Sequence, residues 1–145
     1  MIIFCDGKCM PKNPGDIGIY CFIAFDDSGN EIAKECRHYK GWTTNNENEY
    51  RSVILALEWL ATNADKLQDK RVEILSDSQL VVNQVTGKWM CWEERLRPLM
   101  LRARALIQKL KDKGFWIRIK WIRRHHNLAD ELTWDYYRKI KHSIR

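Results

Sequence analysis

At 145 residues the chain has the usual length of one domain, long enough to bury a single core but too short for two independent ones. Hydrophobic residues make up 45% of it, which excludes a disordered chain, and no apolar run approaches the roughly 20 residues of a membrane-spanning helix. The net charge is +6. Since the opening MIIFCDG reaches an acid too early for a secretory signal, we expect a cytoplasmic protein. We also expect a single domain over residues 1–145 that acts as a monomer.

Three strands are predicted in the first part of the chain. Residues 1–5 and 17–25 are apolar runs, and residues 31–39 form a more polar stretch of similar length. The segments between them, residues 11–15 and 26–30, are rich in turn-forming residues. Connections this short predict an antiparallel meander of three strands.

An amphipathic helix over residues 46–61 comes next, because Tyr50, Val53, Leu57 and Leu60 recur on one face at helical spacing. The elements predicted after it are strands over residues 72–75 and 117–121 and helices over residues 78–85, 93–113 and 128–141. Pro98 suits the first turn of the longest helix, and Gly114 suits its C-terminal cap.

The resulting order, βββαβααβα, predicts the α/β class. Its two crossovers should be right-handed, which places the fourth and fifth strands parallel to the first. We expect a mixed sheet with helices on both faces.

The charge is unevenly distributed along the chain. Residues 1–70 carry 8 Lys and Arg against 11 Asp and Glu, whereas residues 71–145 carry 17 against 8. Because each neutralised phosphate releases counterions, the basic half is a candidate surface for a polyanion. The alternative is a face of solvated lysines and arginines.

The cysteines are odd in number and have no CxxC spacing, so the sequence suggests neither a disulfide framework nor a zinc site. We expect free thiols at all five positions: Cys5, Cys9, Cys21, Cys36 and Cys91.

Two predicted strands run into an acid, Asp6 after MIIFC and Asp77 after VEILS. If these strands are parallel neighbours, their carboxyl ends share one edge, where α/β proteins commonly place chemistry. Two carboxylates that close favour a cation between them, and hard oxygen ligands suit Mg²⁺ or Mn²⁺. The alternative for Asp77 is a cap of the helix that follows it.

Two further acids lie near helix starts. Glu49 lies one turn inside the first long helix, after the polar run TTNN, whose hydroxyl, amide and backbone donors could also bind a phosphate. Asp130 lies near the start of the last helix. Taken alone, Glu49 is a dipole partner or solvated charge, and Asp130 is a surface acid.

The four blocks FCDGKC, TTNNENEY, LSDSQLVVNQVTGKW and WIRRHHNLADEL, in this order, resemble type 1 ribonuclease H over nearly the entire chain. The resemblance implies a ribonuclease H-like fold with five strands in the order 3-2-1-4-5. It also implies hydrolysis of the RNA strand of RNA/DNA hybrids by two Mg²⁺ ions, with Mn²⁺ as a substitute, leaving 5′-phosphate and 3′-hydroxyl ends. The metal-binding carboxylates it implies are Asp6, Glu49, Asp77 and Asp130.

The same resemblance implies substrate-binding residues. Sensing a 2′-hydroxyl across a wide minor groove distinguishes RNA from DNA, and small polar groups can do this. The implied positions are Asn13, Asn46 and Gln79 near the minor groove, Thr44 and Asn45 at a DNA phosphate, and Trp89 beside the DNA backbone. The alternative for Trp89 is a place in the core.

The chain departs from the better-studied bacterial pattern. After Trp92 it continues directly into a long helix without a basic protrusion, which resembles the compact archaeal-type branch. Cys91 lies where a polar residue of the phosphate pocket is expected. The loop over residues 9–15 is one residue longer, and no hybrid-binding module is expected ahead of Asp6. The helical arginines that could substitute for the protrusion, or form a solvated face, are Arg95, Arg97, Arg102 and Arg104.

A histidine near the last acid assists catalysis or product release in many members of the family, a role suited to a group that titrates near neutrality. His126 is the candidate here and His125 the alternative, the competing interpretation being an exposed basic loop.

Three rival hypotheses remain at this point. One is a relative with another substrate, such as an exonuclease, which TTNNENEY and DSQLVVNQ disfavour. The second is a ribonuclease H domain derived from a retroelement or phage. The third is a nucleic-acid-binding module that kept the fold and lost turnover, which the presence of all four acids disfavours.

Overall fold

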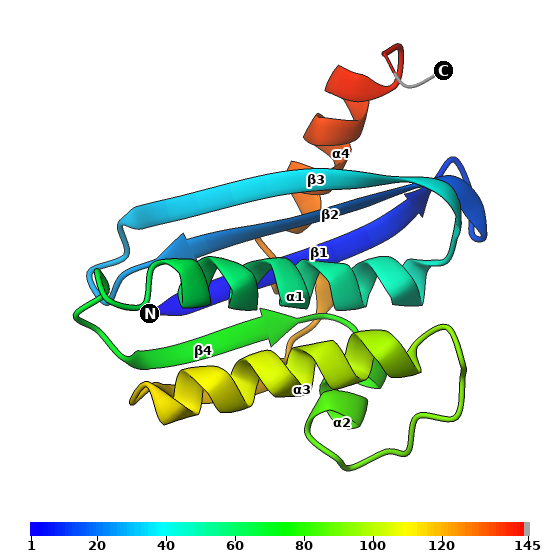
Figure 1. Cartoon of the computed structure of the whole chain (residues 1–145). Coiled ribbons are helices and arrows are strands. Elements are labelled where there is room, and N and C mark those ends of the chain that lie inside the picture. Colours follow the sequence, from blue (N-terminus) through cyan, green and yellow to red (C-terminus); the bar gives the residue numbers. More distant parts are fainter. Residues whose placement is uncertain (144–145) are drawn as a thin grey trace.

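A computed structural model describes residues 1–143, and the last two positions of the expected 1–145 domain lie outside the described residues. At its centre is a five-stranded sheet in the order β3-β2-β1-β4-β5, as predicted (Figure 1). The first three strands form the antiparallel meander, β4 runs parallel to β1, and β5 runs parallel to β4. The strands are β1 (Ile2–Met10), β2 (Gly15–Phe25), β3 (Glu31–Thr43), β4 (Arg71–Ser76) and β5 (Trp116–Trp121).

Helices cover both faces of the sheet, as predicted (Figure 1). Three of them lie on one face, and the last packs on the other face against β1 and β2. None of the helices within residues 1–143 combines the length and apolar character that crossing a bilayer demands. The helices are α1 (Asn45–Thr62), α2 (Gln79–Val85), α3 (Arg97–Asp112) and α4 (Asp130–Ile140), and a 3-10 turn, η1 (Arg124–His126), precedes α4.

Alternation along β2 divides the core between the two faces. Phe22 is buried in the main cluster with α1 and α3, whereas Ile19 and Cys21 lie in a smaller cluster with Leu132 and Tyr136 of α4. Because successive side chains of a strand point to opposite faces, one strand contributes to both layers.

β1 is longer than the five residues predicted for it. Its parallel pairing with β4 ends at Cys5↔Ser76, but its antiparallel pairing with β2 continues to Met10↔Ile17. The second partner keeps the chain extended past Cys5. Asp6 consequently lies inside a strand, and the expectation that it follows the strand end is corrected.

The helix predicted over residues 93–113 is α3, which begins at Arg97 and not at residue 93, and Pro98 lies in its first turn. Proline has no amide hydrogen to donate and clashes with the preceding turn, so a helix cannot extend four residues ahead of it without a break. The interpretation of Pro98 as the start of the regular helix is confirmed.

The expectation of free thiols is wrong for Cys21 and Cys36. They are register partners on β2 and β3, their Cα atoms lie 4.2 Å apart, and their sulfurs are bonded. The pairing depends on a register shift between Ala24 and Phe25, which sets Cys36 opposite Cys21. The other three cysteines are free and buried.

Candidate active site

Asp6 and Asp77 lie side by side where the pairing of β1 with β4 ends. Both follow the last paired residues, Cys5 and Ser76, on neighbouring parallel strands. The cap of α2 is Ser78, whose hydroxyl accepts a hydrogen bond from the Val81 amide at 3.2 Å. The alternative role of Asp77 as that cap is therefore excluded.

The N-terminal part of α1 brings Glu49 to the same edge. Thr44 and Glu47 form a capping box that fixes the start of the helix: the Thr44 hydroxyl accepts from the Glu47 amide, and the Glu47 carboxylate accepts from the Thr44 amide. The helix touches β1 at Gly7, where a Cβ would lie 2.0 Å from the carbonyl oxygen of Asn48. Only glycine permits this approach, which sets Glu49 beside Asp6.

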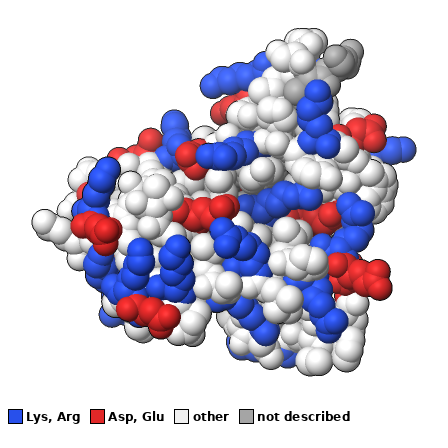
Figure 2. Space-filling view, in the orientation of Figure 1, with Lys and Arg blue, Asp and Glu red and all other residues white. Residues whose placement is uncertain are grey.

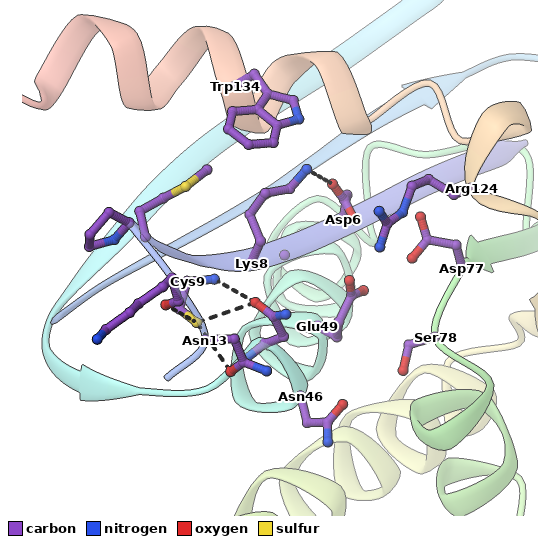
Figure 3. Close-up of a pocket in the computed structure, with 15 residues that line it drawn as sticks. Asp6, Lys8, Cys9, Asn13, Asn46, Glu49, Asp77, Ser78, Arg124 and Trp134 are labelled. Atoms are coloured by element: carbon purple, nitrogen blue, oxygen red, sulfur yellow. Dashed lines mark hydrogen bonds and ion pairs between the residues drawn. The ribbon is translucent and has the colours of Figure 1, made fainter. Parts of the chain in front are cut away.

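The three carboxylates converge. One oxygen from each of Asp6, Glu49 and Asp77 lies within 4.8 Å of the other two, in a cavity of about 430 Å³ (Figure 3). Glu49 is only 9% exposed, and its Oε2 is buried with no hydrogen-bond partner among residues 1–143. A buried carboxylate oxygen without a partner is costly unless a proton or a cation binds it.

Burial and mutual repulsion disfavour ionisation of these acids. Burial raises the pKa of Asp6 to about 6, with Asp77 adding to the shift and Lys8 opposing it. Burial, followed by the charge of Asp6, raises the pKa of Glu49 well above its usual range. Burial also raises the pKa of Asp77. A divalent cation that prefers oxygen ligands would relieve the repulsion and bind the free oxygen of Glu49, so the donor set fits such an ion.

Asp130, the fourth predicted carboxylate, joins the others through Lys8. The Lys8 Nζ lies 2.5 Å from Asp130 Oδ1 and 3.2 Å from Asp6 Oδ2. The Thr133 hydroxyl donates to the Asp130 carbonyl at 2.6 Å and lies 3.3 Å from Asp6 Oδ2. The first turn of α4 is thereby attached to β1, with Asp130 at the margin of the cluster of three.

Asn127 connects the elements around Asp77. Its amide nitrogen donates to the Cys5 carbonyl at 2.8 Å and to Asp77 Oδ2 at 3.1 Å, and its Oδ1 accepts from the Ala129 amide at 3.0 Å. Asn127 is buried, so these bonds are shielded from water. The residue fixes Asp77 relative to β1 and to the start of α4.

The three asparagines predicted to bind substrate, Asn13, Asn45 and Asn46, line the same cavity. Figure 3 shows Asn13 and Asn46 on its wall. Asn13 Oδ1 accepts from the Asn45 amide at 3.1 Å, and Asn45 Oδ1 accepts from the Cys9 amide at 2.9 Å. These bonds tie the loop after β1 to the start of α1.

Gln79 and Trp89 lie outside the cavity lining. Gln79 is the exposed first residue of α2. Trp89 is 47% exposed between α2 and α3, so the alternative place in the core is wrong. Thr44, the remaining predicted contact, engages its hydroxyl in the capping box of α1.

The histidines and the four arginines predicted to lie on the long helix are outside the cavity lining, and Arg95 precedes α3, which begins at Arg97. His125 and His126 are exposed in η1, with ring centroids 4.1 Å apart. Three of the arginines have protein partners. Arg95 pairs with Glu47, Arg102 pairs with Glu58, and Arg104 donates to the Gln84 carbonyl.

The cavity-lining residues that sequence reasoning missed include Lys8, Arg124 and Trp134. The charge of Arg124 lowers the pKa of Asp77, against the larger effect of burial. Lys8 lies 4.6 Å from the centroid of the Trp134 ring. Lys8 follows Asp6 by two residues and shares a strand face with it, but only because β1 continues past Cys5 to Met10.

Fold and site together define an α/β protein with a carboxylate cluster beside the carboxyl end of β4. The family model described as RNase H matches residues 1–136. The chain belongs to the RNase H family.

The relatives are similar over most of this chain but are mostly longer. The bifunctional protein Rv2228c of Mycobacterium tuberculosis is 32% identical over 124 residues, which cover 85% of this chain and 32% of the relative. Ribonuclease HI of Halobacterium salinarum is 37% identical over 100 residues, covering 69% and 47%. The chain therefore spans less than half the length of these two relatives.

Solved structures agree with the fold. LC11-RNase H1, isolated from compost by a metagenomic approach, superimposes with a TM-score of 0.82 at 32% identity and covers 95% of each chain. The same protein has been solved in complex with an RNA/DNA hybrid, and that structure gives a TM-score of 0.74 at 30% identity over 91% of each chain. With the halobacterial relative, these matches confirm a type 1 ribonuclease H of the compact archaeal-like type.

Proposed function

We propose that the chain is an endonuclease that hydrolyses the RNA strand of RNA/DNA hybrids and leaves 5′-phosphate and 3′-hydroxyl ends. The observation that carries the proposal is the convergence of Asp6, Glu49 and Asp77 within 4.8 Å in an open cavity. Family membership supports the reaction, and the similarity to LC11-RNase H1, solved with a hybrid, supports the substrate. We treat residues 1–145 as one ribonuclease H domain that acts as a monomer.

The cofactor we propose is a pair of Mg²⁺ ions, for which Mn²⁺ can substitute, held by Asp6, Glu49, Asp77 and Asp130. When bound, such ions activate water for in-line attack on phosphorus and stabilise the departing oxygen. The chain contributes positioning. Asn127 fixes the Asp77 carboxylate by a hydrogen bond of 3.1 Å, and the close contact at Gly7 fixes Glu49 against β1.

Substrate contacts belong to the same proposal. The places of Asn13, Asn45 and Asn46 on the cavity wall support contacts near the scissile phosphate, and the exposure of Trp89 leaves its ring free to contact a DNA backbone. Gln79 and Thr44 complete the proposed set. His126 is the proposed catalytic histidine because η1 places it two residues after the cavity-lining Arg124, and His125 is the alternative.

Incubating the chain with a labelled hybrid, double-stranded RNA and double-stranded DNA, with Mg²⁺ and then with chelator, tests the proposal. We expect cleavage of the RNA strand of the hybrid alone, abolished by chelator. Binding without cleavage would favour the binding-module hypothesis, and cleavage of DNA would favour another nuclease of this fold. A domain derived from a retroelement or phage would give the expected products, so that alternative concerns origin and not chemistry.

A further inference from the structure

The side-chain amine of Lys8 lies between two of the four carboxylates. Its Nζ lies 3.2 Å from Asp6 Oδ2 and 4.6 Å from the centroid of the Trp134 ring (Figure 3). The same nitrogen lies 2.5 Å from Asp130 Oδ1. Two carboxylates and an aromatic face are good partners for an ammonium group. The Lys8 side chain is 16% exposed, so the amine is largely shielded from solvent.

The Lys8 amine divides the four carboxylates into two sets. Asp6, Glu49 and Asp77 present oxygens within 4.8 Å of one another, whereas Asp6 and Asp130 are bridged by Lys8. Asp6 belongs to both sets. The carboxylate cluster is therefore open to a cation on the Glu49 side and already contains one on the Asp130 side.

A divalent ion cannot share the Asp130 side with the amine. Mg²⁺ binds oxygen ligands at about 2.0–2.1 Å, and one oxygen of each carboxylate on that side, Asp6 Oδ2 and Asp130 Oδ1, is in contact with Lys8 Nζ. Repulsion between the ammonium and the ion adds to the steric conflict in a cavity where water screens charges poorly. One cation has to leave before the other binds.

We propose that Lys8 is a built-in competitor of the second divalent ion. It neutralises Asp6 and Asp130 while one ion is bound, and it must swing away before a second ion binds. The inference rests on the proposed function, since it concerns the same carboxylates, but it describes ion binding without nucleic acid. The two ions bind in sequence, the first at Asp6, Glu49 and Asp77 and the second with an affinity that Lys8 lowers.

The test counts Mn²⁺ bound to the chelator-stripped full chain, without nucleic acid, from the electron paramagnetic resonance signal of free Mn²⁺. The wild type should bind one ion tightly and a second weakly. Lys8→Met should bind the second ion at least about 10-fold more tightly, because its oxygens are no longer occupied by an amine. Lys8→Arg, which keeps a cation, should resemble the wild type.

Lys12→Met is the matched control. Lys12 lines the same cavity but makes no ion pair with a carboxylate among residues 1–143, so this variant removes one positive charge without freeing Asp130. Its Mn²⁺ isotherm should follow that of the wild type. Identical isotherms for Lys8→Met and the wild type, or equal gains in Lys8→Met and Lys12→Met, would overturn the proposal.

A measurement on the wild type keeps the proposal testable if Lys8→Met does not fold. Acylation of Lys8, followed by peptide mass spectrometry, should be slow in chelator and accelerate at the Mn²⁺ concentration that fills the second site. An unchanged rate would contradict the displacement of Lys8. Hybrid cleavage is measured separately. If Mn²⁺ displaces Lys8 but the chain does not cut the hybrid, the proposed function is wrong and the role of Lys8 stands. If the chain cuts the hybrid but Mn²⁺ does not displace Lys8, only the proposed role of Lys8 is wrong.

Discussion

At the scale of single residues, the site is a set of buried charges that oppose one another. Burial raises the pKa of Asp6 and of Glu49, while Lys8 and Arg124 supply positive charge against Asp6 and Asp77. Protons and divalent ions then compete for the same oxygens, because only the ionised carboxylates bind metal. The stability of the metal-free chain should therefore depend on pH in a defined direction.

In chelator, the free energy of unfolding should fall as the pH rises from about 4 to 7. Burial raises the pKa of Asp6 from 3.8 to about 6, so the folded chain binds the proton more tightly, and the stability present at low pH is lost through that range. The Asp6 contribution is on the order of 2–3 kcal/mol. Urea unfolding at several pH values measures it, and Asp6→Asn should give a flatter profile. Parallel profiles for the two proteins would count against a raised pKa at Asp6.

At the scale of secondary-structure elements, the site depends on close packing between α1 and β1. The contact of Gly7 with the Asn48 carbonyl leaves no room for a side chain, and the capping box at Thr44 fixes where α1 begins. Glu49 reaches Asp6 because α1 both begins at a fixed residue and packs directly against the backbone of β1.

Gly7→Ala should destabilise the fold and abolish cleavage together. The added methyl group would lie 2.0 Å from a backbone oxygen, so α1 must shift away from β1, at a cost of at least about 1–3 kcal/mol. Thermal unfolding and hybrid cleavage measure the two effects. Gly29→Asn is the control, because a Cβ at Gly29 meets no atom within 4 Å and asparagine tolerates its positive φ. Wild-type stability in Gly7→Ala would contradict the packing account.

The elements also show what the sequence could predict. The mixed sheet with helices on both faces follows from periodicity, short turns and right-handed crossovers, and it is confirmed. The strand order was implied by the resemblance to type 1 ribonuclease H, and it is confirmed as well. The length of β1 depends on its pairing with β2, which no local pattern reveals. Lys8 was overlooked for this reason, since a strand that stops at Cys5 gives it no shared face with Asp6. The bond between Cys21 and Cys36 likewise depends on a one-residue register shift.

At the scale of the whole molecule, the excess of positive charge lies on the helices and strands of the second half of the chain. Residues 71–145, which carry 17 of the Lys and Arg residues against 8 acids, include α2, α3, β5 and α4. Figure 2 shows Lys and Arg side chains spread over the face that carries α1 and α3, with acidic side chains among them. A surface of this kind suits the sequence-independent contacts that a phosphate backbone offers.

Hybrid binding should therefore weaken with salt. The affinity of the Asp6→Asn chain for a hybrid, measured in chelator by fluorescence anisotropy, should fall at least about 10-fold between about 50 and 200 mM NaCl, because phosphate contacts release counterions. The affinity for double-stranded DNA of equal length, measured in the same way, shows how much of the salt dependence comes from phosphate contacts that any duplex offers. An affinity that does not change with salt would show that the basic elements do not contact the backbone.

The convergence of Asp6, Glu49 and Asp77 is the geometric basis of the proposed chemistry, and cleavage by Asp6→Asn tests it. This substitution keeps the size of the side chain and removes its charge, so the chain should fold, as thermal unfolding in chelator can verify. With Mg²⁺ and a labelled hybrid, the wild type should cut the RNA strand, and Asp6→Asn should be slower by at least about 100-fold. A folded Asp6→Asn chain that cuts the hybrid at the wild-type rate would contradict the assignment of the site.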